Sequence, residues 1–320
     1  MKKLLIIFLL LAVAGTIFFF FAPNYFNKST KTTKYTIGIL QTASHPALDA
    51  AREGFMHTMQ NKLHSDISFI VQNAEGSIAH AHAIAQRFQS NKKIDGFFAI
   101  ATPAAQALAA VEKNRFITLA AVTDPHALGI IKENSNITGS TDMIDVPGQI
   151  KMLTTLIPTA KTVALLYNNA EINSKTVAEK MIAELNKSGI STLKICISCE
   201  ADLGTALDSA LKNADVLLAP TDNLVASAIS FIAKRALQAK KPLIVSDNLL
   251  IKYGPLAARG VDYYKSGEQA GAIAAELLAT KKKPYQIPFV QALSNTVYIN
   301  KNTANTLGIS TPEIKDILYV

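Results

Sequence analysis

The sequence predicts an α/β protein built from two doubly wound parallel sheets. Short apolar runs with polar ends alternate with segments of helical length, as expected for strands that helices cover on both faces. The order β-α-β-α-β-α-β occurs twice, which implies right-handed crossovers in each half. The segment IATPAAQAL from Ile100 is matched by LAPTDNLVASAI from Leu218, and the 320 residues are enough for two domains.

The stretch from Gly96 to Leu108 shows the joint that recurs along the chain. Gly96 to Ile100 is a continuous apolar run that predicts a buried strand. Thr102 stands where an N-cap is expected, and Pro103 fits the first helical position. A hydroxyl and free backbone N–H groups would then lie at the end of a strand, where open α/β sheets bind ligands.

The remaining elements of the first half follow the same pattern. Ser44 and His45 are expected to cap a helix whose apolar positions keep helical spacing, and Ser77 is expected to cap the next helix. The expected strands are 35–42, 68–73, 116–122 and 137–141, and the expected helices are 46–62, 77–89 and 146–157.

The second half repeats the scheme from Thr162. Gly189 suits the end of its first helix because a left-handed residue often follows the last turn. The expected strands are 162–167, 192–197, 215–219, 242–245, 256–262, 287–291 and 296–299, and the expected helices are 173–187, 203–212, 222–238 and 263–279.

The N-terminus predicts export of the chain. Two lysines precede an apolar run from Leu4 to Ala22, longer than the core of most signal peptides and near the length of a membrane span. A cleaved signal peptide and an uncleaved transmembrane anchor both fit residues 1–34, and the polar residues 24–34 read as a tether. In either case the positive charges stay inside and the body is periplasmic or otherwise extracytoplasmic.

The two cysteines, Cys196 and Cys199, have the C-x-x-C spacing. They follow a strand and do not open a helix, so the setting that activates redox pairs is missing. A small structural disulfide and two inert thiols both remain open, and two ligands do not make a zinc site.

Composition argues against nucleic-acid binding. The formal net charge is +8, but the lysines are scattered and no basic helix is interleaved with aromatic residues. We therefore interpret the charge as a solvated basic surface.

The chain lacks the motifs of the common α/β enzymes. There is no G-x-G-x-x-G after the first strand, no phosphate-binding P-loop and no G-x-S-x-G elbow. Only His45 and scattered strand-end carboxylates (Asp124, Asp142, Asp222, Asp247 and Asp262) could serve as acids or bases. We therefore expect a protein that is not an enzyme and that uses no cofactor and no metal.

The polar residues at the strand ends suit a small zwitterion. Hydroxyls and helix N-termini can hold a carboxylate, and Asp222 or Asp247 can pair with an ammonium group. For Asp222 the alternative is a helix cap without a binding role.

These segments together resemble the substrate-binding proteins of ABC importers, in the group that includes tryptophan-binding proteins. The resemblance covers about residues 35–310 and rests on IGILQ from Ile37, HPALDAAREGF from His45, AIATPAAQA from Ala99, AVTDP from Ala121, PTDN from Pro220 and GVDYY from Gly260. No cysteine follows the apolar run, which departs from the lipoprotein members of the family.

The resemblance implies a type I periplasmic binding-protein fold with two lobes, a hinge and a ligand cleft between them. The N-lobe would hold residues 35–142 and 264–283, and the C-lobe residues 145–261 and 285–320. By similarity the ligand would contact His45, Leu48, Thr102, Thr123, Asp124, Asn168, Thr221, Asp222 and Asp247.

We therefore expect a monomer that binds an amino acid, such as the aromatic tryptophan, and closes about its hinge to present it to an ABC permease in the inner membrane. His45 and Leu48 would flank the ligand's side chain, and Thr102 would bind its carboxylate. The alternative is a membrane-anchored sensory receptor for a small solute.

Overall fold

Two sheets organise the chain in its computed structural model, which describes residues 35–126, 129, 135–280, 282–292, 296–310 and 317–319. The first sheet has the strand order β11-β5-β4-β3-β1-β2, and its pairings are parallel. Its strands are β1 (Tyr35–Gln41), β2 (Ile67–Asn73), β3 (Gly96–Ile100), β4 (Ile117–Val122), β5 (Ile137–Thr141) and β11 (Val290–Gln291).

The second sheet has the order β13-β12-β10-β9-β8-β6-β7. All its pairings are parallel except that of β10 with β12. Its strands are β6 (Thr162–Tyr167), β7 (Ser191–Cys196), β8 (Val216–Ala219), β9 (Leu243–Asp247), β10 (Ala257–Val261), β12 (Val297–Ile299) and β13 (Ile317–Tyr319).

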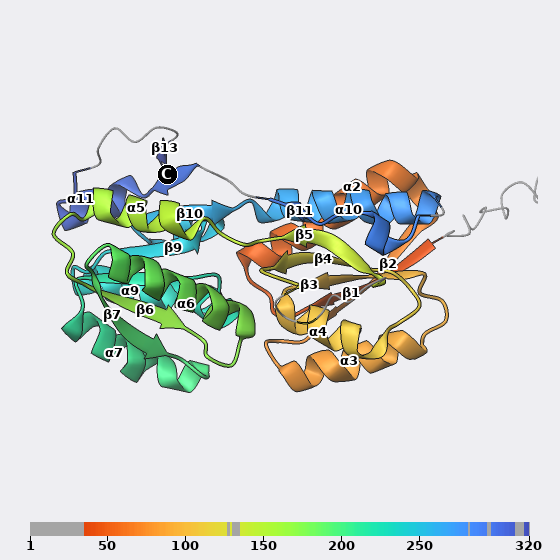
Figure 1. Cartoon of the computed structure of the whole chain (residues 1–320), viewed down its shortest axis with the longest axis horizontal. Coiled ribbons are helices and arrows are strands. Elements are labelled where there is room, and N and C mark those ends of the chain that lie inside the picture. The colour runs from red at the N-terminus through yellow and green to blue at the C-terminus, as the bar shows by residue number, and fades with distance from the viewer. Residues whose placement is uncertain are drawn as a thin grey trace, which may run out of the picture. The chain divides into compact units, whose positions relative to one another are not determined.

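Helices cover both faces of the first sheet (Figure 1). On one face Phe55 of α2 stacks on Phe98 of β3 with ring centroids 3.9 Å apart. Phe97 points to the opposite face and shares a core with Leu108, because successive strand residues alternate. The helices are α2 (Pro46–Leu63) and α10 (Tyr263–Ala279) on the Phe55 face, and α3 (Ile78–Ser90) and α4 (Thr102–Val111) on the other.

The second sheet has the same layering. Its helices are α5 (Val146–Leu156) and α6 (Ile172–Lys187) on one face, and α7 (Leu203–Asn213), α8 (Asn223–Ser227) and α9 (Ile229–Gln238) on the other, with α11 (Lys301–Leu307) near the C-terminus. Short 3₁₀ turns complete the elements at His64–Asp66, Glu200–Asp202, Asn248–Tyr253 and Pro284–Gln286.

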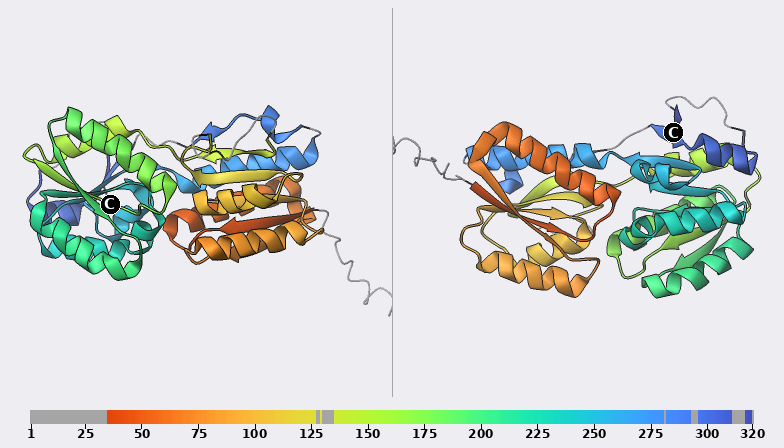
Figure 2. Two further views of the ribbon diagram at one scale, coloured as in Figure 1. Left: turned by 60° about the horizontal axis from the view of Figure 1, so that its bottom comes forward. Right: turned by 180° about the vertical axis from the view of Figure 1, so that it is seen from behind.

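Helices α2 and α10 lie side by side although some 200 residues separate them (Figure 2). Glycines make this approach possible: a Cβ at Gly267 would stand 1.9 Å from the carbonyl oxygen of Ala51. A Cβ at Gly54 would meet the carbonyl oxygen of Tyr264 at 2.2 Å. The C-terminal part of the chain is thereby packed onto the first sheet.

The chain crosses between the sheets after β5, after β10 and after β11. The crossovers are hydrogen-bonded to one another: the N–H of Asp262 donates to the carbonyl of Ala292 at 3.2 Å, and the N–H of Ala292 donates to that of Thr141 at 3.4 Å. Arg259 adds an ion pair to Asp145 at 2.8 Å. These residues form a narrow bridge beside the carboxyl ends of both sheets.

Three details of the helices and strands differ from the sequence prediction. The helix expected over 222–238 is two helices, α8 and α9, which meet at Ala228. Helix α11 and strand β13 were not predicted. Val290–Gln291, expected to belong with the second half of the chain, pairs with β5 in the first sheet. Both cysteines are free and exposed, so of the two alternatives, a disulfide or two thiols, the structure shows two thiols.

The predicted caps at Thr102 and Ser44 are wrong. Ala101 is the N-cap of α4, with φ at +74°, and Thr102 is the first helical residue. The cap of this helix comes from Thr42, which follows β1: its hydroxyl accepts from the N–H of Ala104 at 3.2 Å. His45 is the N-cap of α2, and the Ser44 hydroxyl donates to Asp49 at 2.9 Å.

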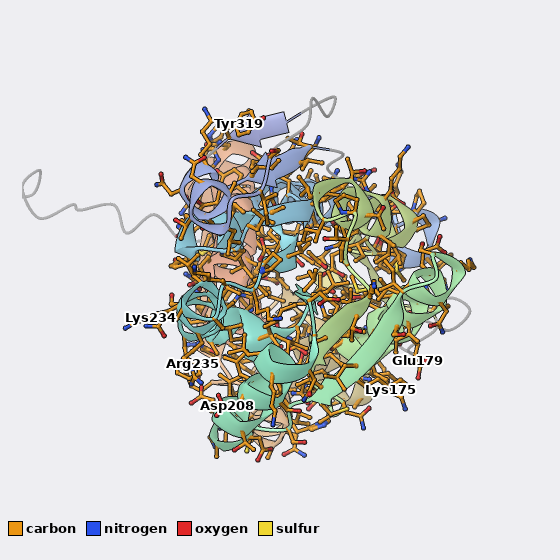
Figure 3. All side chains as sticks on the ribbon, turned by 90° about the vertical axis from the view of Figure 1, so that its left-hand side faces the viewer. Lys175, Glu179, Asp208, Lys234, Arg235 and Tyr319 are labelled. Carbon is orange, nitrogen blue, oxygen red and sulfur yellow. The ribbon has the colours of Figure 1, made fainter. Side chains whose placement is uncertain are left out.

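Charged side chains cover the outer helices of the second sheet. Figure 3 shows Lys175 and Glu179 on α6, Asp208 on α7, and Lys234 with Arg235 on α9. Charges of both signs are interspersed there, as in a solvated surface. Within the described ranges no helix has the length and apolar character needed to cross a bilayer, and the apolar run of residues 4–22 lies outside those ranges.

Candidate functional site

A small cavity of about 30 Å³ lies where the carboxyl ends of the two sheets face each other. The residues that line it are His45, Ala47, Leu48, Ala121, Asp142, Asn173, Ala219, Pro220, Thr221, Asp222, Asn223, Val225, Ala226, Val245, Asp247, Leu250 and Tyr263. His45, Ala47 and Leu48 follow β1, Ala121 lies near the end of β4, and Asp142 follows β5. The other lining residues come from the second sheet, from the segments that follow its strands, and from α10.

Asp142, Asp247 and Tyr263 form an acidic cluster beside the crossovers, here called the acid pole. The Tyr263 hydroxyl donates to one Asp142 oxygen at 3.0 Å, and the other Asp142 oxygen is buried without a hydrogen bond among the described residues. Asp247 caps the following turn by accepting from the N–H of Leu249 at 2.8 Å. Because Asp142 follows β5 and Asp247 ends β9, the acid pole joins the two sheets.

The acid pole holds carboxyl groups that have no cationic partner within it. Burial raises the pKa of Asp247 to about 7, and the charge of Asp142 contributes to this rise. Burial also raises the pKa of Asp142. No lysine or arginine is among the described residues that line the cavity. A buried carboxylate without a partner is costly, so this arrangement favours a cationic group supplied by a ligand.

His45, Asn173, Thr221 and Asn223 form a second, neutral cluster, here called the amide pole. His45 Nε2 lies 3.2 Å from Asn223 Oδ1, and this hydrogen bond connects the first sheet's α2 with the second sheet's α8. Asn223 Nδ2 donates to Glu171 at 2.5 Å. Burial lowers the pKa of His45, so its imidazole is neutral at pH 7.

Several polar atoms of the amide pole have no partner within the protein. His45 Nδ1, Asn173 Oδ1 and Thr221 Oγ1 are buried and make no hydrogen bond among the described residues. Most of the remaining lining is aliphatic, from Leu48, Val225, Ala226, Val245 and Leu250. The cavity thus combines an apolar wall with two polar clusters.

Asp222 lines the cavity, but its carboxylate is occupied by the protein itself. One oxygen accepts from the N–H of Asn168 and from the hydroxyl of Ser174, both at 2.5 Å. The other caps α8 by accepting from the N–H of Val225 at 2.9 Å. This side chain ties the loop after β6 to the loop after β8, which favours the capping alternative over the ammonium role.

Comparison with known proteins identifies the family of this chain. The family model described as ABC transporter substrate binding protein matches residues 36–317. The chain belongs to this family. A tyrosine-binding protein of Clostridioides difficile strain R20291 is 33% identical over 302 residues, which are 92% of this chain and 87% of that protein.

Two solved structures show the same fold. An ABC domain in complex with L-Trp from Streptococcus pneumoniae has a TM-score of 0.85 at 27% identity, and the match covers 89% of this chain and all of that one. The ligand-free, open structure of a substrate-binding protein with adhesive properties from Clostridium difficile has a TM-score of 0.68 at 32% identity, with 89% and 99% covered. The predicted fold class is confirmed.

Membership in the substrate-binding family establishes the general function of the protein. Such proteins bind a small molecule for an ABC transporter outside the cytoplasm, and they do so without chemical conversion. The prediction that the protein is not an enzyme is therefore confirmed by its family.

The structure brings together five of the nine predicted ligand contacts: His45, Leu48, Thr221, Asp222 and Asp247 line the cavity. Thr102, Thr123, Asp124 and Asn168 stand at the same sheet edges but not among the lining residues. The assignment of each side chain to the ligand stays a prediction.

The sequence interpretation missed Asp142, Asn173, Asn223 and Tyr263 as lining residues. Asp142 and Tyr263 each directly follow an expected strand, which was the available signal. Asn173 is the second residue of α6 and lies at the start of the helix expected over 173–187, in the polar stretch that follows β6.

Proposed function

We propose that this protein captures an aromatic L-amino acid between two lobes and delivers it, as a monomer, to the permease of an ABC importer. The observation that carries the proposal is the acid pole, a pair of buried carboxyls at one side of an apolar cavity with no protein cation in the described cavity wall. The ligands in the names of the relatives, tyrosine and L-Trp, have the ammonium group and the apolar ring that this cavity suits.

The ammonium group of the ligand pairs with Asp247 and Asp142 in this proposal. Its carboxylate lies toward Thr102, whose hydroxyl oxygen is buried without a hydrogen bond among the described residues, and toward Thr123, whose hydroxyl also lies beside Asp142. These threonines follow β3 and β4, and β4 is the neighbour of β5, which leads to Asp142. The order of the strands thus supports hydroxyl donors next to the acid pole.

The lobes in this proposal are residues 35–142 with 264–283, and 145–261 with 285–320, corrected by moving Val290–Gln291 to the first lobe. The three crossovers are the hinge. The described conformation is nearer to the L-Trp complex (TM-score 0.85) than to the ligand-free, open structure (0.68), although the latter is more similar in sequence. The higher TM-score to the L-Trp complex supports a closed conformation, which the His45–Asn223 hydrogen bond stabilises.

A titration with L-tryptophan tests the proposal directly because the chain has no tryptophan of its own. We expect saturable, blue-shifted ligand emission as the indole enters the apolar cavity, with a thermal-shift panel of other amino acids alongside. A ligand at about 100 times its Kd adds about 2.7 kcal/mol of stability. Absence of any response across the aromatic amino acids would refute the proposed ligand class.

Binding should also release protons near neutral pH. The pKa of Asp247 is about 7 in the free site, and an ammonium partner lowers it, so ligand binding expels the proton. Affinity is then full above about pH 7 and falls as the pH drops through that value, because the protonated Asp247 must first ionise. Calorimetry near pH 6.5, slightly below this pKa, in buffers of different ionisation enthalpy measures the release. Asp247→Asn should reduce this release, because Asp142 is then the remaining carboxyl of the acid pole, and equal heats in all buffers for the unmodified protein would contradict the assignment.

A further inference from the structure

We propose that the amide pole determines ligand specificity by hydrogen-bonding a phenolic hydroxyl, so that the protein selects tyrosine over phenylalanine and tryptophan. This inference rests on the proposed function, since it needs the ligand's ammonium group at the acid pole. It concerns His45, Asn173 and Thr221. The ligand's ammonium and carboxylate groups are assigned to other residues, so these three have no role in the proposed function.

The hydrogen bonds around Asn223 fix which atom of His45 is left as an acceptor. Asn223 Nδ2 donates to Glu171, so Asn223 Oδ1 is the atom that faces His45 Nε2 at 3.2 Å. An amide oxygen only accepts, so Nε2 carries the proton of the neutral imidazole. His45 Nδ1 is then a bare acceptor, and it is buried without a partner among the described residues.

Asn173 and Thr221 supply the complementary groups. Asn173 Nδ2 donates to the backbone carbonyl of Thr221 at 3.4 Å, which leaves Asn173 Oδ1 as a second acceptor without a partner among the described residues. The Thr221 hydroxyl, equally unpartnered there, can donate or accept. Both residues are only 7% exposed. A phenol can donate one hydrogen bond and accept another, so it satisfies an acceptor and the hydroxyl at once.

Strand order places Asn173, at the far end of the amide pole, two strand spacings from Asp247. In the second sheet Asp247 ends β9, Thr221 follows the adjacent β8, and Asn173 lies beyond β6, the next strand again. Neighbouring strands are about 4.8 Å apart, so two steps amount to roughly 10 Å. A ligand with its ammonium group at Asp247 therefore extends its ring along the apolar wall and places its para position at the amide pole.

The relative affinities of the three aromatic amino acids follow from this geometry. Phenylalanine would bury the same unpartnered atoms without a hydrogen bond, and a site built to bond a hydroxyl discriminates strongly against the analogue that lacks it. We expect calorimetry to give a Kd for L-tyrosine at least about 100-fold below that for L-phenylalanine. L-tryptophan should bind between the two or near phenylalanine, because its indole N–H donates but cannot accept.

Variants of the amide pole test the assignment. Asn173→Leu and Thr221→Val keep size and remove polarity, and each should weaken tyrosine binding about tenfold or more while phenylalanine binding stays level or improves. Thr221→Ser keeps the hydroxyl and should keep the selectivity. Thr123→Val is the matched control, since a carboxylate contact should affect tyrosine and phenylalanine equally.

The outcomes separate this inference from the proposed function. If the unmodified protein binds phenylalanine within about threefold of tyrosine, far below the expected ratio, the specificity role is refuted while the amino-acid receptor stands. If Asn173→Leu and Thr221→Val, both with native circular dichroism, weaken the two ligands equally, the amide pole is structural and the inference fails. If no aromatic amino acid binds the unmodified protein, the proposed function itself fails.

Discussion

Replacing Asp247 by asparagine is expected to weaken amino-acid binding more than any other single change in the cavity. Asparagine keeps an oxygen that can accept from the N–H of Leu249, so the turn after β9 stays intact. It removes the charge that pairs with the ligand's ammonium group, and leaving one member of a buried ion pair alone costs about 3–5 kcal/mol. We therefore expect the Kd to rise by at least about 100-fold, measured by calorimetry at about pH 8, where Asp247 is ionised.

Asp142→Asn should act in the same direction, because Asp142 shares the acid pole and contacts Tyr263. Asp262→Asn is the matched control. Asp262 lies next to Tyr263 and caps α10 by accepting from the N–H of Lys265 at 2.9 Å, but it does not line the cavity. The Kd of the Asp262→Asn variant for the amino acid should change by less than about twofold. If Asp247→Asn and Asp142→Asn both stay within about twofold, the acid pole does not bind the ammonium group.

Local patterns predicted the sheets because burial leaves a clear periodic signal. The fully apolar run from Gly96 to Ile100 is β3 without a change of boundary, and 137–141 and 162–167 match β5 and β6. Patterns failed where the partner is distant in sequence. The cap of α4 comes from Thr42, some 60 residues earlier, and β11 is too short to show which sheet it joins.

The candidate site was predicted in outline for the same reason. Polar residues at strand ends are visible in a sequence, and together with the family resemblance they pointed to His45, Thr221 and Asp247, which line the cavity. Whether a carboxylate is free cannot be read in this way. Asp222 and Asp247 look alike in sequence, yet Asp222 receives a backbone N–H and a hydroxyl from the loop and helix after β6, some 50 residues away. The choice between them depends on three-dimensional contacts alone.

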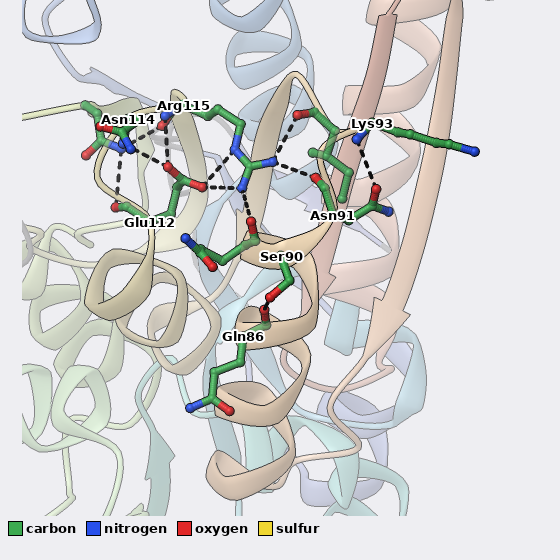
Figure 4. Close-up of polar contacts among 10 residues, drawn as sticks. Gln86, Ser90, Asn91, Lys93, Glu112, Asn114 and Arg115 are labelled. Atoms are coloured by element: carbon green, nitrogen blue, oxygen red, sulfur yellow. Dashed lines mark hydrogen bonds and ion pairs between the residues drawn. The ribbon is translucent and has the colours of Figure 1, made fainter.

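The turn between α4 and β4 depends on one buried ion pair, Glu112 with Arg115 (Figure 4). The Glu112 side chain is 2% exposed and accepts from Arg115 Nε at 2.8 Å and Nη2 at 2.5 Å. The same guanidinium donates to the carbonyls of Gln89, Asn91 and Ile94, at the end of α3 and just after it. It also lies 4.7 Å from the ring centroid of Phe97. Arg115 thus joins α3, α4 and β3.

Arg115→Ala is expected to lower the free energy of unfolding by about 3–5 kcal/mol, because it leaves Glu112 buried without its partner. Urea unfolding measures this loss. Arg115→Lys should recover only part of it, since an ammonium group cannot make the forked contacts of a guanidinium. Arg235→Ala is the surface control: its partner Asp208 is 64% exposed, so the cost should stay below about 1 kcal/mol. Equal losses for Arg115→Ala and Arg235→Ala would contradict the role of the buried pair.

The stability that is lost in Arg115→Ala should depend on pH in a defined direction. Burial alone would raise the pKa of Glu112, but hydrogen bonds from the backbone N–H groups of Arg115 and Asn114 and from the guanidinium outweigh it and hold the pKa below its ordinary value. A carboxyl whose folded pKa is lowered contributes stability above its unfolded pKa, near 4.5, and loses it as the pH falls through the folded value. The difference in unfolding free energy between the unmodified protein and Arg115→Ala should therefore be full at about pH 7 and narrow steadily below about pH 4. A difference that stays constant down to acid pH would show that the arginine acts through its carbonyl contacts alone, because these contacts do not titrate.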